Sequence, residues 1–151
     1  MSTQRTAVKE RKMIEYVHDL PVDEYLDMRI EAGWRGLSRG QAEKGIAGSA
    51  YTVAARDGEK TAGMARVISD GGYIYLIVDV IVRPAYQGQG IGTHMIAMID
   101  EWLQEESRGK PTLMVYLMAA EGKEGFYERF GFLQRPGEHM GAGMSKWLDR
   151  A

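Results

Sequence analysis

Residues 73–92 read YIYLIVDVIVRPAYQGQGIG. The first half of this stretch, up to Val82, is almost entirely apolar or β-branched, which is typical of a strand buried on both faces. Pro84 ends such a strand because its nitrogen carries no hydrogen to donate. Three glycines then alternate between 88 and 92, and apolar residues recur at helical spacing from Ile91 to Trp102. The stretch therefore predicts a buried strand, a glycine-rich turn and a helix in succession.

A glycine-rich turn at the start of a helix has a defined chemistry. Its backbone N–H groups converge with the unpaired N–H groups of the first helical turn, where the helix macrodipole is positive. Together they form an anion site suited to a phosphate or pyrophosphate. A P-loop would need a lysine directly after Gly92, and a dinucleotide fingerprint starting at Gly88 would need a glycine in place of Thr93. A turn that merely connects the two elements is the alternative interpretation.

Two motifs carry a resemblance to a known family. The pattern Gln87-x-x-Gly90-x-Gly92 after a strand resembles the acyl-CoA signature of the GNAT superfamily of N-acetyltransferases. In that family the loop holds the pyrophosphate of coenzyme A. Residues 125–132, GFYERFGF, resemble the family segment F-Y-x-x-x-G-F. The resemblance implies an α/β (α+β) fold of the GNAT type: a mixed, mostly antiparallel central sheet flanked by helices, with the acyl-CoA in the splay between two central strands.

The resemblance also implies roles for particular residues. Tyr127 takes the place of the family tyrosine that protonates the departing thiolate, a reasonable role for a phenol with a pKa of about 10. A packing role for Tyr127 is the alternative. The backbone near Val80 is expected to donate to the thioester carbonyl, and Val82 to pair with the pantetheine arm. The coenzyme-binding residues implied are Val80, Ile81, Val82, Gln87, Gly88, Gln89, Gly90, Ile91, Gly92, Thr93 and Tyr127.

One acid, Asp79, stands in the otherwise apolar strand. A buried carboxylate is unfavourable unless it is hydrogen-bonded or ion-paired. Two interpretations of Asp79 stay open: a base that takes a proton from the attacking ammonium, directly or through water, and a structural acceptor for N–H groups. The chain departs from the family at Ala119 and Ala120, where many members carry an asparagine, and at Leu76, where some carry a carboxylate base.

The acceptor amine is expected on the side opposite coenzyme A, again by resemblance. Residues predicted to line that side are Arg29, Trp34, Tyr73, Tyr75, His139 and Met140. The aromatic residues among them favour a flat or apolar amine, although aromatic side chains more often serve packing. The glycine-rich residues 137–147 can form a lid, a hairpin or an interface segment. The three histidines show no metal-ligand spacing, so no metal site is predicted.

The composition limits the classes of protein to which the chain can belong. The 151 residues carry a net charge of -2 and are 44% hydrophobic, which excludes gross disorder and a basic surface for nucleic acid. We expect one domain over 1–151, with residues 1–10 as a flexible tail. The absence of cysteine excludes a disulfide framework and a cysteinyl-acyl intermediate. No signal-peptide pattern and no apolar run long enough to span a membrane are present, so a cytoplasmic protein without a membrane partner is expected, and a homodimer remains open.

The remaining pattern predicts the other elements. Strands are expected over 12–20, 51–56, 61–69 and 112–118, the last as a buried strand, with short candidates at 132–135 and 144–147. The dipeptide Asp57-Gly58 indicates a hairpin. Helices are expected from an Asp23 cap to about Gly33, from a Ser38 cap with breaks at Gly45 and Gly48, over about 90–109, and over about 121–130.

The resemblance implies an N-acetyltransferase. It would transfer an acetyl group from acetyl-CoA to a primary amine of a small molecule by direct attack in a ternary complex, without a metal. A protein acetyltransferase acting on lysine or an N-terminus is an alternative. A non-catalytic sensor that binds acyl-CoA is a further one.

Overall fold

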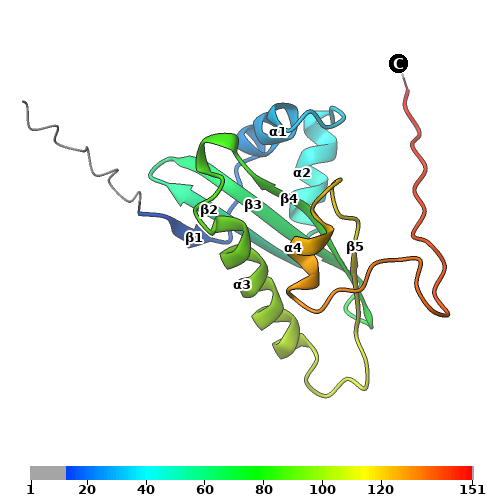
Figure 1. Ribbon diagram of the computed structural model, residues 1–151. Coiled ribbons are helices and arrows are strands. Elements are labelled where there is room, and N and C mark those ends of the chain that lie inside the picture. Colours follow the sequence, from blue (N-terminus) through cyan, green and yellow to red (C-terminus); the bar gives the residue numbers. More distant parts are fainter. Residues whose placement is uncertain (1–12, 151) are drawn as a thin grey trace, which may run out of the picture.

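The computed structural model describes residues 13–150 (Figure 1), so the tail predicted at 1–10 lies outside the described residues. The strands are β1 (Glu15–Val17), β2 (Tyr51–Asp57), β3 (Lys60–Ser69), β4 (Ile74–Val82) and β5 (Met114–Leu117). The helices are α1 (Val22–Glu31), α2 (Arg39–Ala47), α3 (Ile91–Glu106) and α4 (Glu124–Glu128), with a 3-10 turn η1 (Pro84–Tyr86). Within the described residues, no helix is both long enough and apolar enough to span a membrane.

The strands form one sheet in chain order, β1 to β5. All neighbours are antiparallel except β4 and β5, which run parallel and are joined through α3. Helices α3 and α4 cover one face and α1 and α2 the other (Figure 1). Because successive strand residues point to opposite faces, the neighbours Met64 and Ala65 of β3 belong to two separate apolar clusters. The predicted mixed, mostly antiparallel sheet flanked by helices is confirmed.

Local turn and cap chemistry follows the sequence at two places. The β2–β3 hairpin turns at Asp57-Gly58, where Gly58 has a φ of 60°. Ser38 caps α2 in a capping box: its hydroxyl accepts from the Gln41 N–H, and the Gln41 side chain accepts from the Ser38 N–H. Both predictions are confirmed.

Three expectations about the helices were wrong. The N-cap of α1 is Pro21. Asp23 lies in the first turn, where the helix dipole stabilises a carboxylate. Gly45 does not break α2, which continues to Ala47 with Gly48 as its C-cap. Helix α4 is shorter than expected, covering Glu124–Glu128.

The C-terminal third departs most from the sequence prediction. No strand forms at 132–135 or 144–147; the chain makes only an isolated bridge between Gly137 and Met140. As a result β5 is an edge strand rather than the buried strand expected, and its Met114 and Tyr116 are exposed. The chain beyond the bridge runs as an extended segment on the β5 side of the molecule (Figure 1).

Candidate active site

Strands β4 and β5 diverge halfway along β4. The β4–β5 pairing ends at Ile77 and Leu117, whereas β4 continues to Val82. The backbone groups of residues 78–82 on that side therefore have no strand partner. This is the splay in which the acyl-CoA is expected.

Asp79 marks a distortion of β4. Its φ of 53° is in the left-handed region, which is uncommon for a residue with a side chain. On the other side of β4, Met64 pairs with Ile81 while Arg66 pairs with Val78, so β4 carries an extra residue here. Bulges of this kind turn a strand and re-aim its side chains. The bulge lies where β4 separates from β5.

The splay opens into a cleft of about 680 Å³. Its walls come from the end of α1, the splayed half of β4, the glycine-rich turn, the start of α3, the end of β5 and α4. Every residue predicted to bind the coenzyme lines this cleft except Gln89. Elements far apart in the sequence thus bring the two predicted motifs, the glycine turn and Tyr127, to one cavity.

The glycine turn has the geometry that anion binding requires. Gly88 and Gly90 have φ values of 79° and 81°, which only glycine adopts without strain. Gly90 is the N-cap of α3 and offers no side chain, so the N–H groups of the first turn stay open to a ligand. A Cβ on Gly92 would touch the Phe126 ring at 3.6 Å, so α4 packs directly against this turn. The cradle suits a pyrophosphate.

Side chains hold the turn in place. Gln87 Nε2 donates to the carbonyl of Val82 at 3.0 Å and ties the turn to the end of β4. The Tyr86 hydroxyl donates to Asp57 Oδ2 at 2.6 Å. The Arg129 guanidinium donates to Thr93 Oγ1 at 3.3 Å and thereby adds a positive charge beside the α3 N-terminus.

Tyr127 lies on α4, belongs to the apolar core on the α3 side of the sheet and lines the cleft. The residue is 8% exposed, and its ring meets those of Phe126 and Phe132 edge-on. Within residues 13–150 its hydroxyl makes no hydrogen bond and is not fully buried. Burial raises the pKa of Tyr127 above the usual 10.0. The phenol is therefore neutral and can donate a proton.

Asp79 is held by three donors. Its Oδ2 accepts from the Tyr25 hydroxyl at 2.5 Å and from Arg66 Nε at 2.8 Å, and its Oδ1 accepts from Arg29 Nη1 at 3.0 Å. The side chains of Asp79 and both arginines are only 10–11% exposed. Burial, and then the hydrogen bond to Asp79, raise the pKa of Tyr25. The carboxylate is thus the shared partner of two buried cations.

The predicted acceptor residues divide into two groups. Trp34 lines the cleft, and the Arg29 guanidinium lies 5.4 Å from the Trp34 ring centre. Tyr75 does not reach the cleft: it is fully buried on the α3 side, where its hydroxyl donates to Glu106 Oε2 at 2.9 Å.

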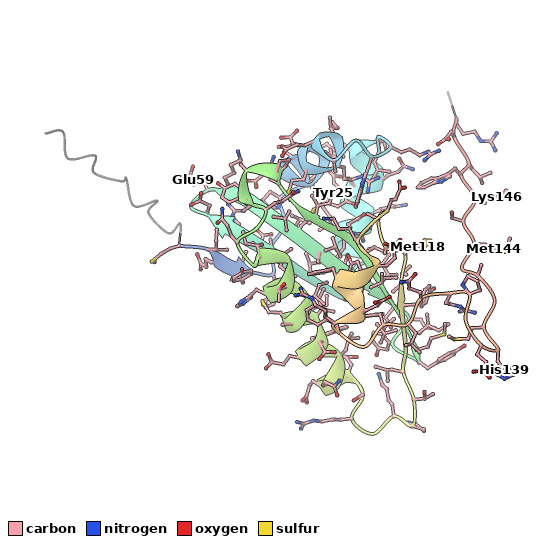
Figure 2. The ribbon with its side chains drawn as sticks, viewed as in Figure 1. Tyr25, Glu59, Met118, His139, Met144 and Lys146 are labelled. Atoms are coloured by element: carbon pink, nitrogen blue, oxygen red, sulfur yellow. The ribbon has the colours of Figure 1, made fainter. Side chains whose placement is uncertain are left out.

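Three more predicted acceptor residues lie elsewhere. Tyr73 is exposed just before β4, and neither it nor Met140 lines the cleft. His139 lies at the tip of the bridge that Met140 closes, well away from the sheet (Figure 2). His139 and Met140 do not reach the cleft because the C-terminal residues form no strand that would return them to it.

Sequence reasoning missed other cleft residues, including Glu31, Met118 and Lys123. Glu31 is the last residue of α1, and its Oε2 accepts from Arg83 Nη1 at 2.9 Å. Its Oε1 has no hydrogen-bond partner within residues 13–150. No sequence motif distinguishes Glu31 from other helix-end glutamates. Across the same described residues, no group of three His, Cys, Asp or Glu side chains is placed to hold a metal ion.

A splay between β4 and β5, a glycine turn at a helix N-terminus and a protonated phenol meet at one cleft of this mixed α/β domain, which is the arrangement expected from the two sequence motifs. Comparison with known proteins agrees: residues 47–134, more than half of the chain, match the family model described as an acetyltransferase (GNAT) domain. The chain therefore belongs to the GNAT acetyltransferase family.

Individual relatives point the same way. The chain is 38% identical over 74 residues to the histone acetyltransferase TAP1 of Glycine max, covering 49% of this chain and 30% of that protein. It therefore spans less than a third of the length of that relative. A structure from meticillin-resistant Staphylococcus aureus, described as a protein of unknown function, SA2161, and probable acetyltransferase, has a TM-score of 0.81 and 31% identity over 90% of this chain and 100% of its own. A GNAT family protein of Streptococcus pneumoniae, SP0256, has a TM-score of 0.68 and 26% identity over 92% of this chain and 98% of its own.

Proposed function

We propose that the protein is an N-acetyltransferase that transfers an acetyl group from acetyl-CoA to a primary amine of a small molecule. The observation that carries this proposal is the convergence of the glycine turn and the Tyr127 hydroxyl on one cleft. The turn would supply a site for the pyrophosphate, and Tyr127 would supply an acid in the same cavity. Direct attack within a ternary complex suits a chain that has no cysteine to carry the acyl group.

The coenzyme would supply an activated acetyl thioester. The open N–H groups at Gly90–Thr93 would bind its pyrophosphate, aided by the helix dipole and by Arg129. The unpaired edge of β4 at Val80–Val82 would pair with the pantetheine amides, as an added strand does. A backbone N–H near Val80 would donate to the thioester carbonyl as negative charge develops on its oxygen.

Tyr127 would act as the general acid. Once neutral, the acceptor nitrogen forms a bond to the acetyl carbon, the carbon–sulfur bond breaks, and the sulfur receives the Tyr127 hydroxyl proton. The proton that the nitrogen loses as it becomes an amide returns the phenolate to the phenol through water. Because the pKa of Tyr127 is raised by burial, the phenol stays protonated at neutral pH. General acid catalysis of this kind contributes about 10²–10⁴-fold.

We assign Asp79 a positioning role. Both of its oxygens already accept hydrogen bonds, from Arg29, Arg66 and Tyr25. Neither oxygen is therefore left unpaired to act as a base. These contacts hold the bulge of β4 and so fix the direction of the Val80 N–H. The second interpretation made from the sequence, a structural acceptor, is the one that the geometry supports, although its donors are side chains instead of backbone N–H groups.

Glu31 is the better candidate for the base. Among the described residues that line the cleft, the carboxylates are Asp79 and Glu31. Glu31 keeps one oxygen without a hydrogen-bond partner within residues 13–150, while Arg83 orients the other. It would take the proton released by the attacking ammonium, directly or through water.

A protein lysine competes with the small-molecule amine as the proposed acceptor. The relative from Glycine max is named a histone acetyltransferase, which favours a protein lysine as acceptor. The aromatic wall at Trp34 and the end of α1 favour a small amine. The third candidate is a sensor that binds acyl-CoA without turnover. The presence of Tyr127 in the cleft favours catalysis over this candidate.

The test combines binding and turnover. Thermal unfolding is followed with acetyl-CoA, which at 100 times its Kd stabilises by about 2.7 kcal/mol. Thiol release is then measured with a panel of small primary amines and with lysine-bearing peptides. Turnover with one small amine supports the proposal, and turnover with peptides alone supports the protein acceptor. Stabilisation without turnover supports the sensor, and no stabilisation refutes all three.

A further inference from the structure

The position of Trp34 in the cleft wall is fixed by the way α1 ends. Gly33, with a φ of 76°, follows the C-cap of the helix in a left-handed conformation that glycine adopts without strain. Its N–H donates to the carbonyl of Ile30 at 2.9 Å, and the Trp34 N–H donates to the carbonyl of Arg29 at 3.0 Å. These two bonds form a Schellman motif, in which the second residue after the C-cap packs back on the last turn of the helix. The motif therefore brings Trp34 next to Arg29.

The Arg29 side chain ties the Trp34 segment to the sheet. Its guanidinium carbon lies 5.4 Å from the centre of the Trp34 ring, and its Nη2 donates to the carbonyl of Arg35 at 3.0 Å. Its Nη1 donates to Asp79 Oδ1, also at 3.0 Å. Its Nε is fully buried and has no hydrogen-bond partner within residues 13–150, which is unfavourable because the donor has lost water without gaining an acceptor. The guanidinium thus reaches Asp79, Arg35 and the ring at once and leaves one donor unpaired.

A molecule in the cleft would meet the Trp34 ring and not the guanidinium. Trp34 lines the cleft, whereas Arg29 is not among the residues that line it. A cation is attracted by the negative charge of an aromatic ring face. Because Arg29 already uses this attraction, a second positive charge at the ring would gain less and would be repelled by the first. An uncharged apolar group can still pack against the ring.

We propose that Arg29 is a specificity-determining residue that acts through Trp34. It fixes the ring as a wall for the apolar body of the acceptor and disfavours acceptors that carry a second positive charge at that end. Glu31, which also lines the cleft, offers one carboxylate for the single ammonium that reacts. This inference rests on the proposed acetyl transfer to a small amine, and it narrows the acceptor to monoamines with an apolar body.

A lysine at position 29 separates this role from the pairing with Asp79. The lysine ammonium is a compact charge that can pair with one carboxylate, but it lacks the planar fork that reaches a second acceptor and stacks on a ring. Arg29→Lys should therefore keep the ion pair with Asp79 and release the Trp34 ring and the Arg35 carbonyl. Arg35→Lys is the matched control, because the Arg35 side chain is 48% exposed and Arg29 binds only the backbone carbonyl of this residue.

The first experiment follows the Trp34 ring without any ligand. The other two tryptophans, Trp102 and Trp147, are replaced by phenylalanine in the full chain, so that the fluorescence comes from Trp34 alone. We expect acrylamide to quench Trp34 more strongly in Arg29→Lys than in Arg35→Lys or in the parent chain. Chemical denaturation shows that the compared chains are folded. Equal quenching in all three would show that Arg29 does not hold the ring and would overturn the proposal.

The second experiment measures specificity by thiol release with hexylamine and with its diamine counterpart, hexamethylenediamine. We expect Arg29→Lys to raise the KM for hexylamine about tenfold, which corresponds to the loss of one contact between a cation and a ring. The kcat and the affinity for acetyl-CoA should stay at their wild-type values, because a KM that rises alone reports lost binding that is common to ground state and transition state.

The same two amines test the selection against a second charge. We expect the wild type to prefer hexylamine. Arg29→Met removes the positive charge and leaves Arg66 to pair with Asp79, so it should reduce this preference, whereas Arg35→Met should not. An unchanged KM in Arg29→Lys, or a wild type that does not prefer hexylamine, would overturn the specificity role and leave acetyl transfer to other acceptors standing. No turnover of any amine, in spite of stabilisation by acetyl-CoA, would overturn the proposed function and this role with it.

Discussion

Arg66 Nε donates to Asp79 Oδ2 at 2.8 Å, across the bulge where β4 leaves β5. Arg29 binds the other oxygen from α1, so a strand neighbour and a helix converge on one carboxylate. The pair therefore couples the shape of the splay to the packing of α1 on the sheet. Its position explains how an acid is tolerated in the most apolar strand of the chain.

Asp79→Asn should destabilise the fold. Removing the charge leaves two buried guanidinium groups without an anion, and breaking a buried pair typically costs about 3–5 kcal/mol of unfolding free energy. Chemical denaturation measures the loss, with Asp27→Asn as the control at an exposed site on α1. A variant as stable as the control that has lost only kcat would instead support Asp79 as a base.

Gly90→Asp should abolish acetyl-CoA binding. The φ of 81° strains any side chain, and a carboxylate at the α3 N-cap repels the pyrophosphate. Isothermal calorimetry measures binding. Gly36→Asp is the control, since Gly36 has open space around it and an ordinary φ. Equal affinity in the two variants would refute the pyrophosphate site.

Tyr127→Phe should lower kcat by about 10²–10⁴-fold and leave acetyl-CoA binding unchanged, because only the donated proton is lost. Tyr73→Phe, at an exposed tyrosine outside the cleft, is the control. Rates are measured by thiol release and binding by calorimetry. Unchanged kcat would show that Tyr127 serves packing alone.

Tyrosine burial also predicts a pH dependence of stability. Burial raises the pKa of Tyr127, so the folded state keeps the phenol proton more tightly than the unfolded state. The associated stability is fully present below the unfolded pKa of about 10 and is lost as pH rises through the higher folded value. Unfolding midpoints between pH 8 and pH 11 check this, and Tyr127→Phe should show a shallower alkaline decline than the wild type.

Glu31→Gln should lower kcat, because a neutral amide cannot take the proton from the attacking ammonium. The amide keeps an oxygen for Arg83, so the fold should persist. Glu43→Gln is the control at an exposed helix site paired with Arg39. A kcat equal to that of the wild type, measured by thiol release, would exclude Glu31 as the base and leave the proton to water.

The sequence by itself determined the features that rest on local chemistry. Alternation of glycines after Pro84 predicts the anion turn because φ values near 80° and a side-chain-free N-cap are properties of those residues alone. Ser38, Asp57-Gly58 and the apolar run of β4 likewise specify a cap, a hairpin and a buried strand within a few residues. The glycine turn and Tyr127 could therefore be predicted before their common cleft was seen.

Only the tertiary structure decided what depends on distant partners. Arg29 and Asp79 are 50 residues apart, and no local pattern pairs them. Glu31 lines the cleft because the end of α1 packs beside it. Tyr75 does not reach the cleft, because its side chain lies on the α3 face of the sheet. The C-terminal residues show the same limit: a strand was expected at 144–147 from the local pattern, but these residues do not pair with the open edge of β5.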